Sequence, residues 1–229
     1  MSNAENASFS ETEVNPEANP EANSSATPVR KRPKPGERRV QILQALATML
    51  EQPGAERITT AALAARLDVS EAALYRHFAS KAQMFEGLIE FIEQTVFSLV
   101  NQIAEREDAL ADASSGARKA AKVVAMLMQF AERNPGMTRV MVGDALVFEN
   151  ERLQQRMNQF FEKIEVTLKQ CLRDDAQAAS SASATPTVDA QVRASVLTAF
   201  VAGRLQRFAR SGFRRLPSEH LEASLALIL

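Results

Sequence analysis

The residues best suited to chemistry lie close together around position 75. Tyr75, His77 and Lys81 each carry a group that can donate a hydrogen bond to a phosphate oxygen. Donors of this kind fix a protein on a nucleic-acid backbone but do not read the base sequence. The chain shows no catalytic spacing of nucleophile, base and orienting group, and no phosphate-binding loop. The sequence therefore predicts a binding protein and not an enzyme.

Metal, cofactor and membrane chemistry finds no support in the sequence. Cys171 is the single cysteine, and neither His77 nor His220 stands at a metal-ligand spacing from it. No window of about 20 apolar residues would cross a membrane, and no charged segment followed by an apolar stretch marks a leader. We therefore expect a cytoplasmic protein with no catalytic residues, no metal and no cofactor.

Two short helices, over residues 60–66 and 71–77, are predicted to position the phosphate donors. Thr59 can cap the first helix and Ser70 the second, because each hydroxyl can accept a hydrogen bond from an otherwise unpaired backbone N–H. The apolar residues that would hold the two helices together are Leu63, Leu67, Val69, Leu74 and Phe78. The stretch from 58 to 78 is therefore interpreted as a helix-turn-helix.

The outer face of the second helix would carry small or polar residues, which let a helix lie deep in the major groove of DNA. Hydroxyls of the first helix would add contacts. The candidate DNA-binding residues are Thr59, Thr60, Ser70, Glu71, Ala72, Ala73, Tyr75, Arg76, His77 and Lys81. A buried helical hairpin that never meets DNA is the alternative. It would require neither the phosphate donors nor a basic segment ahead of the hairpin.

Charge is unevenly divided along the chain, although the formal net charge is only -1. Residues 1–29 hold five Glu and no Lys or Arg, whereas residues 30–39 hold six Lys or Arg against Glu37 alone. A basic run by itself can be merely a solvated, disordered arm. Placed directly before a helix-turn-helix, it favours DNA binding.

Composition and hydrophobic spacing predict an all-α fold, because straight-chain residues abound and the chain has one tyrosine and no tryptophan. We expect a disordered tail with a basic arm over 1–36, a helix-turn-helix domain over 37–82, and a helical regulatory and dimerisation domain over 83–229. A flexible linker is expected over 176–186. Helices beyond the helix-turn-helix are expected from 37 to a stop at Pro53-Gly54, and over 80–109, 117–133, 138–147, 150–173, 187–211 and 217–228.

The stretch from Thr59 to Lys81 resembles the N-terminal domain of TetR-family regulators, whose recognition helix commonly ends in Leu-Tyr-x-His-Phe, as residues 74–78 do here. Asp68 replaces the glycine often found in the turn, but aspartate tolerates the left-handed conformation. The resemblance implies a second domain that usually encloses a small-molecule pocket. The methionines that could line such a pocket, or could equally be plain core, are Met126, Met128, Met137 and Met141.

More specific motifs lie at 70–81, 88–93, 132–136, 145–149 and 152–154. They resemble the SlmA family of nucleoid occlusion factors, and the similarity runs from about Arg38 to Phe213. The resemblance implies a homodimer on palindromic double-stranded DNA, associated with the nucleoid, that inhibits assembly of the division protein FtsZ; larger assemblies on DNA are left open. In that family the C-terminal tail of FtsZ docks between the fourth and fifth helices.

The residues that would receive the FtsZ tail here are Phe91, Met126, Arg133 and Asn134. Phe91 lies off the main apolar stripe of its helix, so it is either an exposed docking residue or part of the core. Leu99 replaces a basic residue of the relatives and Gln129 a small one, so the affinity or pose of the tail is expected to differ.

The last two helices are predicted to form a two-fold dimer, because Ala199, Ala202 and Gly203 permit close helix approach. The apolar surface would come from Val192, Val196, Phe200 and Leu225. Such a dimer would hold its recognition helices about 34 to 36 Å apart. The alternative function is a ligand-responsive TetR-type transcriptional repressor. A closed apolar cavity would favour the repressor, and an open groove between the fourth and fifth helices would favour the division factor.

Overall fold

The computed structural model describes residues 36–52, 58–109, 115–178 and 186–229. The predicted tail and basic arm lie almost entirely outside these residues, as does the predicted stop at Pro53-Gly54. Within the described ranges every regular element is helical, which confirms the all-α prediction. The elements are α1 (Glu37–Leu50), α2 (Thr60–Arg66), α3 (Glu71–Tyr75), α4 (Lys81–Asp108), α5 (Ser115–Arg133), α6 (Pro135–Met141), the 3₁₀ helix η2 (Asp144–Leu146), α7 (Glu151–Ala178), α8 (Pro186–Arg210) and α9 (Leu221–Leu225).

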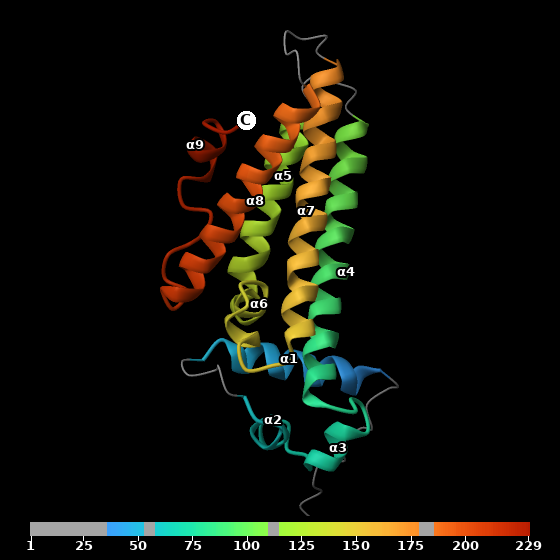
Figure 1. The fold of residues 1–229 in the computed structure, drawn as a ribbon. Coiled ribbons are helices and arrows are strands. Elements are labelled where there is room, and N and C mark those ends of the chain that lie inside the picture. Colours follow the sequence, from blue (N-terminus) through green and yellow to red (C-terminus); the bar gives the residue numbers. More distant parts are fainter. Residues whose placement is uncertain (1–35, 53–57, 110–114, 179–185) are drawn as a thin grey trace, which may run out of the picture. The chain divides into compact units, whose positions relative to one another are not determined.

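The long helices α4, α5, α7 and α8 pack side by side, and α1 crosses beneath them with α2 and α3 on its far side (Figure 1). Helix α5 is central, because it contacts α4, α6, α7 and α8. Its apolar residues between Ala120 and Ala131 are accordingly buried or half-buried, while the polar Lys122 and Gln129 are exposed. Helix α6 packs on α1 and thereby joins the helix-turn-helix part of the molecule to the long helices.

Outside the helix-turn-helix, the predicted boundaries were clearly wrong for three helices. Residues 138–147 were expected to form one helix, but α6 begins at Pro135 and Gly143, with φ +84°, separates it from η2. Proline can start a helix because its missing N–H would be unpaired there anyway. Helix α7 runs to Ala178, into the predicted 176–186 linker, whose residues 179–185 lie outside the described ranges. The helix expected over 217–228 is reduced to Leu221–Leu225, because His220 takes a left-handed φ of 54° just before it.

The methionines mostly belong to the core. Met128, Met137 and Met141 are buried, and Met126 is half-buried against the same cluster. They are therefore explained by packing, the plainer of the two readings.

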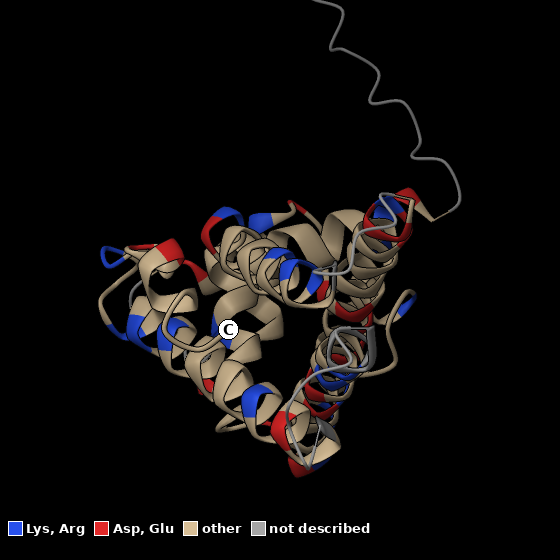
Figure 2. Ribbon diagram, turned by 90° about the horizontal axis from the view of Figure 1, so that it is seen from above, with Lys and Arg blue, Asp and Glu red and all other residues tan. Residues whose placement is uncertain are grey.

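Charged residues of both signs stand close together on the outer faces of the helices (Figure 2). One carboxylate departs from this surface pattern: Glu107 at the end of α4 is only 2 % exposed. It accepts hydrogen bonds from the ammonium of Lys122 and from Nε of Arg118, the latter at 2.5 Å. These two bonds hold the pKa of Glu107 below its ordinary value of 4.5, even though burial opposes the shift.

Glu107→Gln is expected to lower the melting temperature at pH 7 and to weaken the acid dependence of stability. Because the pKa of Glu107 is lowered in the folded chain, its contribution is present above about pH 4.5 and is lost as the pH falls through the folded value. Thermal unfolding of wild type and variant at pH 7 and across the acid range measures this. Asp108→Asn is the control, since Asp108 pairs with Lys119 at an exposed site and should matter little. Equal melting temperatures for Glu107→Gln and wild type at pH 7 would contradict the expectation.

Candidate nucleic-acid interface and partner-binding surface

The helix-turn-helix forms as its local residues dictate. Thr59 caps α2 by accepting from the N–H of Ala62 at 3.1 Å, and Ser70 caps α3 by accepting from the N–H of Ala73 at 3.2 Å. Asp68 lies in the turn with φ 53°, so the left-handed conformation expected of it is confirmed. The caps and the turn set the direction in which α3 leaves α2.

The two helices are held together by the apolar residues predicted for that role. Leu63, Leu74 and Phe78 are buried, and Leu67 and Val69 are half-buried against the core. Helix α3 ends at Tyr75, two residues before the predicted end, so Arg76 and His77 form the turn that leads to α4. The side chains left exposed on the outer side are Glu71, Ala72, Tyr75, Arg76 and His77, while Ala73 is half-buried.

A polar network that the sequence did not indicate joins α2 to α3. The Thr60 hydroxyl donates to Oε2 of Glu71 at 2.5 Å, and the Tyr75 hydroxyl donates to Oγ1 of Thr60 at 3.5 Å. All three side chains were predicted as separate DNA contacts. Their hydrogen bonds give the Glu71 carboxylate a defined position on the exposed face of α3.

Arg39 has a second role that the sequence did not indicate, because there it was counted only as one charge of the basic run 30–39. Its guanidinium lies 4.1 Å from the centre of the Phe78 ring, and Nη1 donates to the carbonyl oxygen of His77 at 3.0 Å. Arg39 therefore holds the exit of the recognition helix against α1. The contact spans 38 positions, so no local pattern could have revealed it.

Helix α4 begins beside this exit. Ser80 caps it by accepting from the N–H of Gln83 at 3.2 Å, and Oε1 of Gln83 accepts in return from the N–H of Ala79 at 2.9 Å. Lys81, predicted as a phosphate contact, places Nζ 2.5 Å from Oε1 of Glu149, which precedes α7. The ammonium is thus paired with a carboxylate of the second helical part.

The predicted partner-binding residues lie on α4, on α5 and directly after the end of α5. Phe91 is 44 % exposed, so the alternative that it belongs to the core was wrong. Arg133 is exposed and Met126 is half-buried. The Asn134 side chain donates from Nδ2 to the carbonyl of Phe130 at 2.7 Å, so it also closes the last turn of α5.

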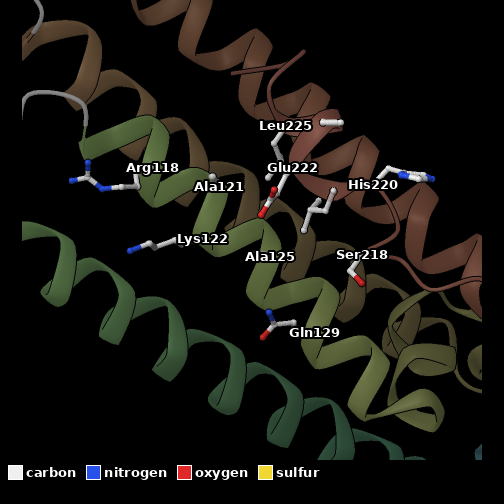
Figure 3. Close-up of a pocket in the computed structure, with 11 residues that line it drawn as sticks. Arg118, Ala121, Lys122, Ala125, Gln129, Ser218, His220, Glu222 and Leu225 are labelled. Carbon is white, nitrogen blue, oxygen red and sulfur yellow. The ribbon is translucent and has the colours of Figure 1, made fainter.

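A hollow of about 760 Å³ runs along α5, and it lies on the side of α9 and not of α4 (Figure 3). Its lining comes from α5 and from the segment 218–225, with Ala121 and Ala125 facing Glu222. The segment is anchored because Oε1 of Glu132 accepts hydrogen bonds from both N–H and Oγ of Ser218, at 3.0 and 2.6 Å. The hollow is open to solvent and none of the methionines lines it, so it is not the closed cavity that would favour a ligand-responsive repressor. No residue of α4 lines it, so it is not the groove between the fourth and fifth helices that would favour the division factor either.

One side of α8 is exposed and apolar. Val188, Val192 and Val196 follow one another along this side, and Gly203 lies further along with open space where a side chain would be. Leu225, which was expected to add to this surface, is buried in the chain's own core. Among the described helices, none is long and apolar enough to span a membrane.

Comparison with known proteins agrees with both parts of the chain. A profile for bacterial regulatory proteins of the TetR family matches residues 42–88. A profile for the tetracyclin repressor-like C-terminal domain, of the SlmA-like type, matches residues 117–229. Solved structures share the fold at low identity: FadR from Bacillus subtilis with stearoyl-CoA has a TM-score of 0.65 and 15 % identity, covering 82 % of this chain and 96 % of that one. AibR with isovaleryl coenzyme A and operator DNA has a TM-score of 0.61 and 15 % identity, covering 83 % and 97 %.

Sequence relatives are much nearer. The nucleoid occlusion factor SlmA of Idiomarina loihiensis is 49 % identical over 186 residues, which cover 81 % of this chain and 90 % of the relative. SlmA of Vibrio cholerae is 50 % identical over 193 residues, which cover 83 % and 93 %. With a TetR-type helix-turn-helix, a matching C-terminal domain and half of its residues shared over almost the full length of these relatives, the chain belongs to the SlmA family of nucleoid occlusion factors.

Proposed function

We propose that this protein is a nucleoid occlusion factor that binds palindromic chromosomal sites as a homodimer and, while bound there, inhibits FtsZ ring assembly. It acts in the cytoplasm at the nucleoid and needs no active site. The observation that carries the proposal is the extent of the family relationship, which spans the helix-turn-helix and the second domain together. The geometry of three surfaces supports it.

The first surface is the exposed face of α3. Ala72 near its start is small, and Tyr75, Arg76 and His77 stand at its end with groups that can donate to phosphate oxygens. A short capped helix whose outer face is exposed to solvent is suited to the major groove. Glu71, fixed by Thr60, is placed to accept from a base edge, where cytosine offers an amino donor.

The second surface is the valine row of α8, which would pair with the same row of a second copy. An isologous contact of this kind buries apolar side chains that are otherwise in water, and Gly203 allows the two helices to approach closely. The two-fold axis would then place two recognition helices on successive turns of a palindrome.

The third surface combines Phe91 on α4 with Arg133 on the neighbouring α5. An exposed aromatic ring and an exposed guanidinium suit a short peptide that carries apolar and acidic groups, as expected of the FtsZ tail. Leu99 is half-buried and Gln129 is exposed at the positions that depart from the relatives, so the peptide is expected to meet a less basic and more crowded surface here.

Fluorescence anisotropy of a labelled FtsZ C-terminal tail peptide, titrated with the protein, tests the partner assignment. We expect saturable binding that weakens about 30-fold or more in Phe91→Ala and in Arg133→Glu, because central interface residues carry most of the binding energy. Phe148→Ala and Arg210→Glu are matched controls, since both residues are exposed but lie elsewhere. Binding that is equally weakened by the controls would show that the tail does not use α4 and α5.

The same titration separates the two candidate functions. If neither wild type nor variants bind the peptide while DNA binding is intact, the ligand-responsive repressor becomes the better assignment. The open hollow along α5 would then be the first place to look for an effector.

A further inference from the structure

Two ion pairs of opposite polarity connect the start of α4 to the start of α7. Lys81 pairs with Glu149, and farther along both helices Glu86 pairs with Arg152. The two members of the first pair differ in burial, because the Glu149 side chain is only 9 % exposed whereas that of Lys81 is 31 % exposed. The Lys81 side chain is therefore the more accessible of the two, while its carboxylate partner is largely covered by protein.

Lys81 also occupies a position where an anion is expected. It is the first residue of α4, next to the Ser80 cap and directly after the turn that closes the recognition helix. The N-terminal end of a long helix attracts negative charge, and His77 in the preceding turn offers a further donor. A DNA duplex bound to α3 would bring its phosphates toward the Lys81 ammonium, which is already paired with Glu149.

We propose that in the free protein the Glu149 carboxylate pairs with Lys81 in the position that a DNA phosphate would take. The second domain then sets DNA affinity through this one carboxylate. The inference rests on the proposed DNA binding and adds a residue outside the helix-turn-helix to it. A phosphate that approaches Nζ of Lys81 also approaches the Glu149 carboxylate, and the two like charges repel. DNA binding therefore requires either that the ion pair opens or that this repulsion is tolerated.

The coupling works in both directions, since any contact that differs between the free and bound states links the two sites. When a DNA phosphate pairs with Lys81, the ion pair between Lys81 and Glu149 breaks. Glu149 lies between η2 and α7, beside the exposed Val147 and Phe148. Removal of the Glu149 charge should in turn favour the DNA-bound state. This sign distinguishes competition from structural support, because a variant that merely damages the fold cannot bind DNA more tightly.

The test measures binding of a labelled random-sequence duplex by anisotropy at several salt concentrations, for wild type, Glu149→Gln, Lys81→Gln and the double variant. Glu149→Gln is expected to bind about 3- to 10-fold tighter, with a slope of log affinity against log salt steeper by about one, as for one added phosphate contact. The double variant is expected to match Lys81→Gln, because the gain passes through Lys81.

Glu86→Gln is the matched control, since it removes the same charge from the adjacent ion pair. Its gain should be smaller and should persist when Lys81 is replaced. An unchanged or weaker affinity for Glu149→Gln, or a gain that survives in the double variant, overturns the inference while leaving the proposed DNA binding intact. If wild type and Glu149→Gln both fail to bind the duplex, the proposed function and the inference fall together.

Thermal unfolding checks that each variant is folded. If Glu149→Gln is not folded, Glu149→Asp replaces it, with a smaller gain in affinity expected.

Discussion

Replacing Gly136 with alanine is expected to lower the free energy of unfolding by about 3 kcal/mol, because added atoms in a packed interface force neighbouring groups apart. A Cβ at Gly136 would lie 1.9 Å from the carbonyl oxygen of Ala47 and 2.9 Å from its carbonyl carbon. These are backbone atoms of α1, so no side-chain rotation relieves the overlap, and α6 must move away from α1. Urea unfolding of the variant and wild type measures the difference.

Gly87→Ala provides the comparison, since a Cβ there would meet only side-chain atoms, with Phe78 at 3.1 Å and Leu43 at 3.4 Å. These groups can shift, and alanine gains about 1 kcal/mol over glycine in a helix, so the net change should be small. Equal unfolding free energies for the two variants would show that α6 and α1 are not as tightly joined as the structure has them. Because this contact connects the helix-turn-helix to the long helices, Gly136→Ala is also expected to weaken DNA binding.

Gly136 also illustrates where the sequence is ambiguous. The helix expected over 117–133 stops before Asn134-Pro135-Gly136, and α5 does end at Arg133. The same residues start α6, because proline disfavours helix in the residue before it but is itself favoured at the first position of a helix, which Pro135 occupies here. The need for glycine comes from Ala47, which is distant in the sequence, so composition alone gives no reason for it.

Features set by residues within one turn were predictable. The caps at Thr59 and Ser70 each use a hydroxyl and an N–H three residues on, and both formed as expected. The long helices followed their apolar spacing, and α4 agrees with its predicted range within one residue at each end. The DNA-binding and partner-binding assignments remain predictions, although the exposure of most of these side chains is compatible with both.

Features set by distant residues were not predictable. The shortened α9 follows an irregular stretch in which Ser218 is fixed by Glu132 across 86 positions. The hollow along α5 is on the α9 side for the same reason, since that anchored segment forms its other wall. The contacts of Arg39 and Lys81 belong to this group as well, because their partners His77 and Glu149 lie 38 and 68 positions away in the sequence.

Replacing Arg39 with glutamine is expected to weaken binding to a palindromic site, selected from a random library with wild-type protein, by about 30-fold. The estimate takes about 2 kcal/mol for loss of the stacking on Phe78 and of the hydrogen bond to the His77 carbonyl together. Without these contacts the turn after α3 has to be ordered when DNA binds. Anisotropy with the selected duplex measures the loss.

Arg38→Gln is the matched control, because it removes the same charge from the neighbouring residue, which bonds to Gln41 of its own helix at 3.1 Å. It should cost only a small, salt-dependent part of the affinity. Arg39→Lys distinguishes a direct contribution of the Arg39 charge to DNA binding from a role in positioning the turn after α3. If only the positive charge mattered, lysine would restore DNA binding. A lysine cannot stack as a planar group on Phe78 while donating to the same carbonyl, so a positioning role requires that Arg39→Lys remain closer to Arg39→Gln than to wild type.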